Sequence, residues 1–116
     1  MGAIQHVWVR SRGVNLSVEV AMPLDQPDAP TVVLVHGYPD NSEVWKGVRD
    51  QLAKDFVVVT YDCRGAGQST APSSTKGYAL ARFVDDLVAV TDLVSPQQPF
   101  HLVGHDWGSV HSWESV

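Results

Sequence analysis

The segment GHDWGS at residues 104–109 places an acidic side chain between two glycines, directly after the apolar run FHLV (100–103). Asp rarely occurs in strands, and Gly weakens both strands and helices. The spacing Gly, any residue, nucleophile, any residue, Gly is typical of a sharp strand-to-helix turn whose central side chain projects outward. Asp106 holds that central position, where the first amides of a helix favour a carboxylate. We therefore expect Asp106 to be ionised and available as a nucleophile.

Two further loops follow apolar runs in the same way. HGYPDN (36–41) comes after TVVLV (31–35), and DCRGAGQST (62–70) comes after FVVVTY (56–61). In sheets of parallel strands, ligands bind beyond the carboxyl ends of the strands, so these loops should meet the segment that carries Asp106. GAGQST is only superficially similar to a dinucleotide fingerprint, because the third glycine is absent and Pro72 breaks the following helix.

The elements that position these loops follow from the hydrophobic pattern. Nearly continuous apolar runs predict strands covered on both faces at 31–35, 56–61 and 100–103. HVWVR (6–10) and VNLSVEVA (14–21) alternate apolar and polar residues around SRG, which predicts an antiparallel hairpin. Apolar residues at three- and four-residue steps predict two helices, one before and one after the second parallel strand in the sequence. Their apolar positions are Val44, Trp45, Val48 and Leu52, then Leu80, Phe83, Leu87, Val90 and Val94. The expected fold is therefore α/β, with a hairpin followed by parallel strands in a doubly wound sheet.

Composition limits the partners of such a domain. The chain has 116 residues, of which 44% are hydrophobic and 18% are charged, and its net charge is −5. The excess of acidic residues excludes a nucleic-acid surface or an anionic membrane surface, and indicates a small uncharged partner. The N-terminus has no signal-peptide pattern and no segment is long enough to span a membrane. The single cysteine, Cys63, lacks a disulfide partner or a metal-binding spacing, and we interpret it as a buried thiol in a reducing cytoplasm.

The three loops, in this order, resemble the first half of the α/β-hydrolase superfamily. HGYP is similar to its oxyanion loop, DCRGAGQS to the loop after the next strand, and GHDWG to its nucleophile elbow. An Asp elbow followed by Trp resembles the branch of epoxide hydrolases and haloalkane dehalogenases. Tyr38 after HG favours the epoxide hydrolases, because dehalogenases usually have Asn or Glu there. The likeness runs over residues 10–116 and extends to bacterial proteins that fuse such a domain to a short-chain dehydrogenase.

The resemblance implies a two-step reaction without metal or cofactor. Asp106 would attack an epoxide carbon to form an ester, which water would hydrolyse with the help of a histidine base to give a vicinal diol. The backbone amides of Trp107 and Tyr38 would face the oxyanion of the second step. The Tyr38–Pro39 bond is a candidate cis peptide. The resemblance also implies a set of residues that shape the two loops: His36, Gly37, Pro39, Gly104, His105 and Gly108.

The family's acid and base lie well beyond the elbow, so residues 1–116 are expected to form a partial hydrolase domain, truncated just after the elbow. We expect this chain to be poorly soluble or partly unfolded, and to turn over no epoxide. His101 and His105 are poor candidates for the missing base. Three alternatives remain open: a haloalkane dehalogenase, a non-catalytic remnant or one half of a hydrolase–dehydrogenase fusion, and a phospho-acceptor domain. The last requires an acidic magnesium site, for which the loops offer only Asp62.

Overall fold

The expected hairpin forms one edge of a five-stranded sheet. In the computed structural model, which describes residues 2–116, β1 (Ile4–Ser11) runs antiparallel to β2 (Val14–Ala21). The turn residues Arg12 and Gly13 have φ values of 38° and 86°. Two-residue hairpin turns need positive φ because only this backbone twist matches the twist of the strands. The SRG segment thus supplies the glycine that the turn requires.

The remaining strands are parallel neighbours, as the sequence predicts. β2 pairs antiparallel with β4 (Val57–Tyr61), which pairs parallel with β3 (Thr31–Val35), and β3 pairs parallel with β5 (Phe100–Gly104). The strand order is β1-β2-β4-β3-β5. In this register Val35 lies opposite both Tyr61 and Gly104. The three candidate loops therefore leave the sheet at one level, with those after β3 and β5 side by side.

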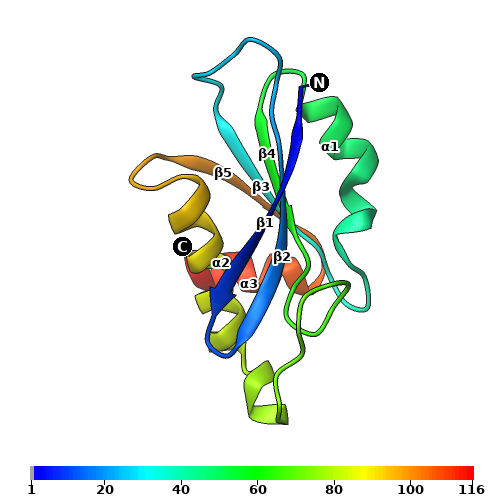
Figure 1. Ribbon diagram of the computed structural model, residues 1–116. Helices are drawn as coiled ribbons and strands as arrows, with labels where there is room; N and C mark the ends of the chain where they lie inside the picture. The colour runs from blue at the N-terminus through cyan, green and yellow to red at the C-terminus, as the bar shows by residue number, and fades with distance from the viewer. Residues whose placement is uncertain (1) are drawn as a thin grey trace.

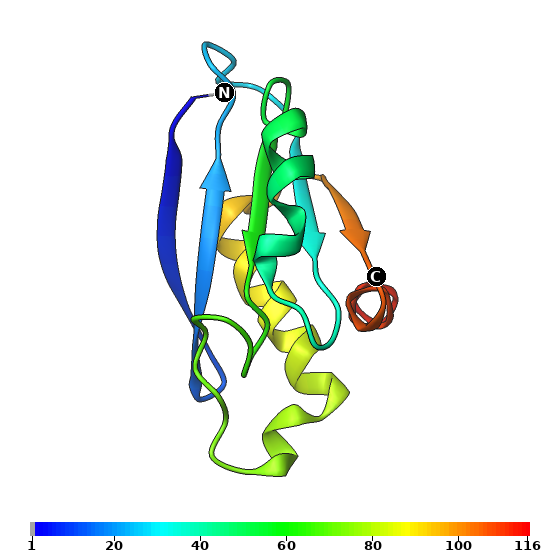
Figure 2. The same cartoon turned by 90° about the vertical axis from the view of Figure 1, so that its right-hand side faces the viewer.

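Helices cover both faces of the sheet, which confirms the doubly wound arrangement (Figures 1 and 2). A 3-10 turn, η1 (Ser42–Trp45), leads into α1 (Lys46–Leu52) on one face. A second turn, η2 (Thr75–Tyr78), precedes α2 (Leu80–Val94) on the opposite face, and α3 (Trp107–Ser115) contacts α2, β3 and β5. The chain leaves β3 toward one face and β5 toward the other. A crevice forms at such a switch point, and this is where ligands bind in open α/β sheets.

Alternating strand residues build a core on each face. Val33, Val35 and Tyr61 pack with Leu87 and Val90 of α2. On the other face Val32, Leu34 and Val58 pack with Ala53, Trp45 and Leu52. No helix within residues 2–116 combines the length and the apolarity that membrane crossing needs.

Two details of the predicted burial are wrong. Val44 and Val48 were expected on the buried side of the first helix but are 50% and 44% exposed, because Trp45, Arg49 and Leu52 form the side that faces the sheet. β5 was expected to be covered on both faces, yet Phe100 and Val103 are 36% and 43% exposed. β5 lies at the edge of the sheet, where fewer neighbours cover it.

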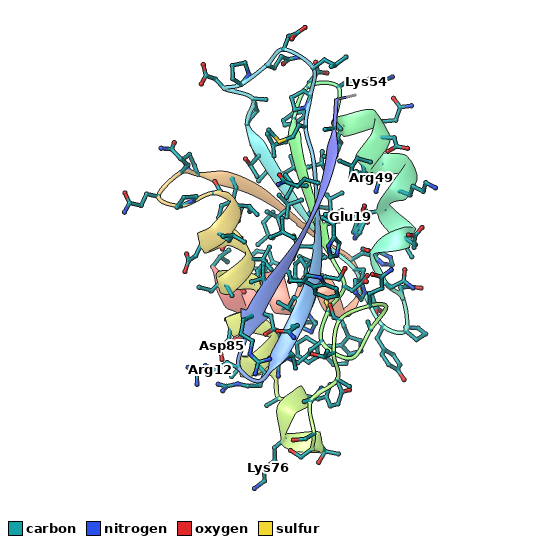
Figure 3. All side chains as sticks on the ribbon, in the orientation of Figure 1. Arg12, Glu19, Arg49, Lys54, Lys76 and Asp85 are labelled. Carbon is teal, nitrogen blue, oxygen red and sulfur yellow. The ribbon has the colours of Figure 1, made fainter. Side chains whose placement is uncertain are left out.

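Ion pairs connect the helices to the hairpin (Figure 3). On the α1 side, Arg49 lies 3.5 Å from Glu19 of β2. On the α2 side, Arg12 of the hairpin turn lies 3.6 Å from Asp85. Figure 3 shows these pairs far apart, one beside α1 and one at the hairpin tip. The Arg12–Asp85 pair is partly exposed and therefore contributes little stability, whereas Arg49 is buried; both pairs agree with the placement of the helices.

Candidate active site

Asp106 occupies a strained turn between β5 and α3. Its φ and ψ are 59° and −126°, a backbone conformation that L residues rarely adopt. The N–H of His105 donates to the carbonyl of Val35 at 3.1 Å, and α3 begins at the next residue after Asp106. The turn thus closes onto the end of β3, and the Asp106 side chain is left exposed.

The two glycines of the pattern allow this close packing. A Cβ at Gly104 would lie 2.5 Å from the carbonyl oxygen of Gly108. A Cβ at Gly108 would collide with the carbonyl oxygens of Val35 and His36. No other residue type fits either position without a shift of the backbone, which is the physical reason for the spacing on each side of Asp106.

The loop after β3 brings an amide to the Asp106 carboxylate. The N–H of Tyr38 donates to Oδ2 of Asp106 at 3.2 Å. The amides of Trp107 and Tyr38, in that order, hold the pKa of Asp106 below its ordinary value, and His105 adds a small effect in the same direction. The carboxylate is therefore ionised at neutral pH, as the helix N-terminus argument predicts. A Cβ at Gly37 would lie 2.5 Å from Cβ of Asp106, so glycine permits this approach, and the Tyr38–Pro39 bond is cis.

His36 braces the same loop. The residue is 3% exposed, its Nδ1 lies 2.7 Å from the carbonyl oxygen of Gly37, and its Nε2 accepts a hydrogen bond from the N–H of Cys63 at 2.9 Å. Since Nε2 is an acceptor, Nδ1 carries the hydrogen and donates to Gly37. Both ring nitrogens are thus used between two loops. This geometry agrees with the expected loop-shaping role of His36.

Buried charges fix the loop after β4. Arg64 and Asp86 form a pair at 2.7 Å in which both side chains are 1% exposed. Arg64 also donates to the carbonyl of Gly77 at 2.7 Å, and Ser11 donates to Asp86 at 2.6 Å. Asp62 accepts from the N–H groups of Ser42 and Gln68. Through these contacts, Asp62 and Arg64 hold the loop after β4 in place.

A cavity of about 810 Å³ opens beside the elbow. Its walls include Tyr38, segment 63–67, and the apolar side chains of Leu80, Phe83 and Trp107. The indole-bearing residue Trp107 is 56% exposed. Such a volume and a mainly apolar lining suit a small uncharged molecule next to a carboxylate.

His111, a residue of the cavity wall, was assigned no role from the sequence. It is 6% exposed and lines the cavity one helical turn after Trp107. The i to i+4 spacing from Trp107 was a signal that could have identified it. His101, in contrast, packs edge-on against Phe56 at 6.2 Å, in the region covered by α1. The expectation that His101 is no base agrees with that position.

Comparison with known proteins agrees with this geometry. A family model for the alpha/beta hydrolase fold matches residues 30–114. The chain belongs to the α/β-hydrolase family. The chain is 51% identical over 88 residues to the probable oxidoreductase EphD of Mycobacterium tuberculosis, and 36% identical over 116 residues to epoxide hydrolase A of the same species. These matches cover 76% and 99% of the chain.

Solved structures support the epoxide-hydrolase branch of this α/β-hydrolase family. A Vigna radiata epoxide hydrolase mutant superimposes with a TM-score of 0.85 at 31% identity, over 99% of the chain. The potato (Solanum tuberosum) epoxide hydrolase I gives a TM-score of 0.85 at 26% identity over 97% of the chain. The chain spans 35% of the length of each of these structures and 15% of the length of EphD.

Proposed function

We propose that this α/β-hydrolase chain carries the nucleophile and the oxyanion donors of an epoxide hydrolase. The observation that carries the proposal is the contact between the Tyr38 amide and the Asp106 carboxylate, 3.2 Å long, beside a cavity that Tyr38 and Trp107 line. It joins an ionised carboxylate from the loop after β5 to a backbone donor from the loop after β3. The epoxide hydrolases among the relatives support the choice of substrate.

In the proposed first step, a carboxylate oxygen of Asp106 bonds to an epoxide carbon. The bond between that carbon and the epoxide oxygen breaks, and the oxygen, still bonded to the other epoxide carbon, becomes an alkoxide that takes up a proton from water. Because the Tyr38 amide holds Oδ2, the carboxylate is fixed in orientation when the substrate arrives. Such positioning lowers the entropic cost of the attack. The product of this step is an ester of Asp106.

In the proposed second step, water attacks the carbonyl carbon of that ester. The ester bond to the acyl carbon breaks, the diol leaves, and the carboxylate of Asp106 is restored. The carbonyl oxygen carries negative charge in between, and the amides of Tyr38 and Trp107 would stabilise it; one such donor is typically worth about 3 kcal/mol. We place the acid and the histidine base of this step outside residues 1–116, since the chain spans only about a third of the epoxide hydrolases it matches.

The same coverage supports a proposal about the larger protein. EphD, which this chain matches over 15% of EphD's length, is named a probable oxidoreductase. We propose that residues 1–116 correspond to the N-terminal part of a hydrolase domain to which a dehydrogenase domain is fused. The thiol of Cys63 is 5% exposed, and burial raises its pKa to about 12, which suits a structural thiol in a reducing cytoplasm.

The proposal can be tested with an epoxide in heavy-oxygen water, followed by mass spectrometry of the Asp106 peptide and of any diol. Attack by Asp106 gives an ester on this peptide, and each ester that hydrolyses leaves the label in Asp106 and an unlabelled first-turnover diol. Labelled diol together with an unmodified, unlabelled Asp106 peptide would show direct attack by water. Asp106→Asn, at nearly constant volume, should abolish both the ester on this peptide and the incorporation of label into it.

A haloalkane dehalogenase is the second candidate, and one observation favours it. Trp107 lies directly after the nucleophile and its side chain is partly exposed at the cavity wall, where an indole N–H could bind a leaving halide. An alkyl chloride would then esterify Asp106 with release of chloride. Chloride release at a rate above that of epoxide consumption would favour this candidate over the first.

A further inference from the structure

His111 is a polar residue on the cavity wall to which the reaction above gives no task. It lies four residues after Trp107 in α3, and residues at this spacing share one face of a helix. Both residues line the cavity. The rise along the helix between them is about 6 Å, so a ligand of moderate length that contacts Trp107 reaches the neighbourhood of His111.

The imidazole of His111 is held in one orientation. It stacks on Phe83 of α2 with 4.2 Å between the ring centroids and 17° between the planes, and the residue is 6% exposed. Its Nδ1 is buried and has no hydrogen-bond partner among residues 2–116. Buried polar groups are usually hydrogen-bonded, so an unpaired one beside a cavity requires an explanation.

Burial keeps this ring neutral. Burial lowers the pKa of His111 to about 4, His36 shifts it in the same direction, and Asp86 opposes them. A neutral imidazole has one N–H donor and one acceptor nitrogen. We assign the hydrogen to Nε2, since an unpaired buried acceptor is less costly than an unpaired buried N–H donor. Nε2, which is not among the buried unpaired atoms of residues 2–116, is then the donor of the ring.

We propose that His111 is a specificity-determining residue that donates a hydrogen bond to an oxygen of the substrate other than its epoxide oxygen. The site accordingly prefers epoxides that carry a hydroxyl or carbonyl group along the chain over purely apolar ones. Leu80, Phe83 and Trp107 of the same wall are apolar, whereas the imidazole of His111 can donate a hydrogen bond. This inference rests on the proposed binding of an epoxide beside Asp106.

The test compares two six-carbon probes, 1,2-epoxyhexane and 5,6-epoxyhexan-1-ol, which differ by one terminal hydroxyl. Binding to the 116-residue chain is measured by NMR titration, together with the ¹⁵N shifts of the His111 ring. We expect the hydroxylated probe to bind about fivefold to tenfold more tightly, the ratio that one hydrogen bond provides. Only this probe should shift the His111 ring nitrogens. Simple partitioning into an apolar cavity would favour the other probe.

Two variants separate hydrogen bonding from packing. His111→Phe keeps an aromatic ring on Phe83 and should abolish or reverse the preference, while His111→Gln keeps an N–H donor and should retain most of it. Equal affinities for the two probes in the parent chain, or a preference that survives in His111→Phe, would overturn the proposal. Failure of both probes to bind would contradict the epoxide site itself and this inference with it. Should His111→Phe not fold, the ring shifts and the Gln variant still decide.

Discussion

Gly108, in the first turn of α3, packs directly onto the carbonyl oxygen of Val35 at the end of β3. This contact sets the distance between the nucleophile turn and the loop that carries the Tyr38 amide. A side chain at position 108 would push the helix away from β3 and would separate the Tyr38 amide from Asp106.

We therefore expect Gly108→Ala to destabilise the chain by about 1–3 kcal/mol, the usual cost of overpacking. The matched control is Gly47→Ala in α1, where a Cβ would meet no atom within 4 Å. Since alanine favours helices over glycine, the control should gain about 0.5–1 kcal/mol. Urea unfolding measures both changes. Equal effects of the two substitutions would show that the contact on Val35 is not tight.

The Arg64–Asp86 pair predicts a large effect of a conservative change. In Asp86→Asn the buried guanidinium of Arg64 loses its countercharge, and breaking a buried pair by removing one partner costs about 3–5 kcal/mol. Asp92→Asn, in the same helix but exposed, should change stability by no more than about 0.5 kcal/mol. A loss below about 1 kcal/mol for Asp86→Asn in chemical unfolding would contradict a buried, ionised pair.

The pH dependence of stability should depend on His111. Its pKa falls from an ordinary value of 6.5 to about 4 in the folded chain, so between these values the unfolded chain binds the proton more readily. His111 therefore contributes stability that is complete above pH 6.5 and decreases as the pH falls toward about 4. His111→Phe should show a smaller decrease between pH 6.5 and 5, where carboxylates stay largely ionised. Unfolding midpoints with parallel pH profiles in the two proteins would contradict this assignment.

Exposed apolar residues of β5 and α3 predict self-association. Phe100, Val103 and Trp113 are 36%, 43% and 76% exposed, and within residues 2–116 β5 pairs only with β3. Apolar surface next to a free strand edge favours association. Val103→Lys combined with Trp113→Glu should reduce oligomers in sedimentation velocity, whereas Val88→Lys, on the outer side of α2, should not. A monomeric parent chain would refute the prediction.

The sequence predicted the sheet and the three loops because their signals are local. A run such as TVVLV needs only its own residues to indicate a buried strand, and GHDWG carries its own packing requirement in two glycines. The sequence predicted a hairpin followed by parallel strands but not the order of the five strands, which the structure gives. The family resemblance also predicted that Asp106 lies beside Tyr38, and the two residues are in contact.

Features that depend on contacts between distant segments could not be predicted from the sequence. The role of His111 depends on Phe83, which a second helix brings against its ring. The exposure of Phe100 depends on which strands flank β5, and an apolar run alone does not report its neighbours. Val44 and Val48 were assigned to the inward side of the first helix, but the buried position between Trp45 and Leu52 belongs to Arg49, which a hydrophobic pattern does not mark.

The most direct test of the central claim is a competition among the carboxylates of this chain for one epoxide. The chain is treated at neutral pH with limiting 1,2-epoxy-3-(p-nitrophenoxy)propane, and the esterified residues are identified by peptide mass spectrometry. Asp28 and Asp92 are exposed and serve as internal controls, because no oxyanion donor is proposed beside either of them. The account predicts that Asp106 is esterified about tenfold faster than these controls or more, and that Asp106→Asn removes only this adduct. Esterification of Asp106 at the same rate as Asp28 and Asp92 would contradict its role as the nucleophile.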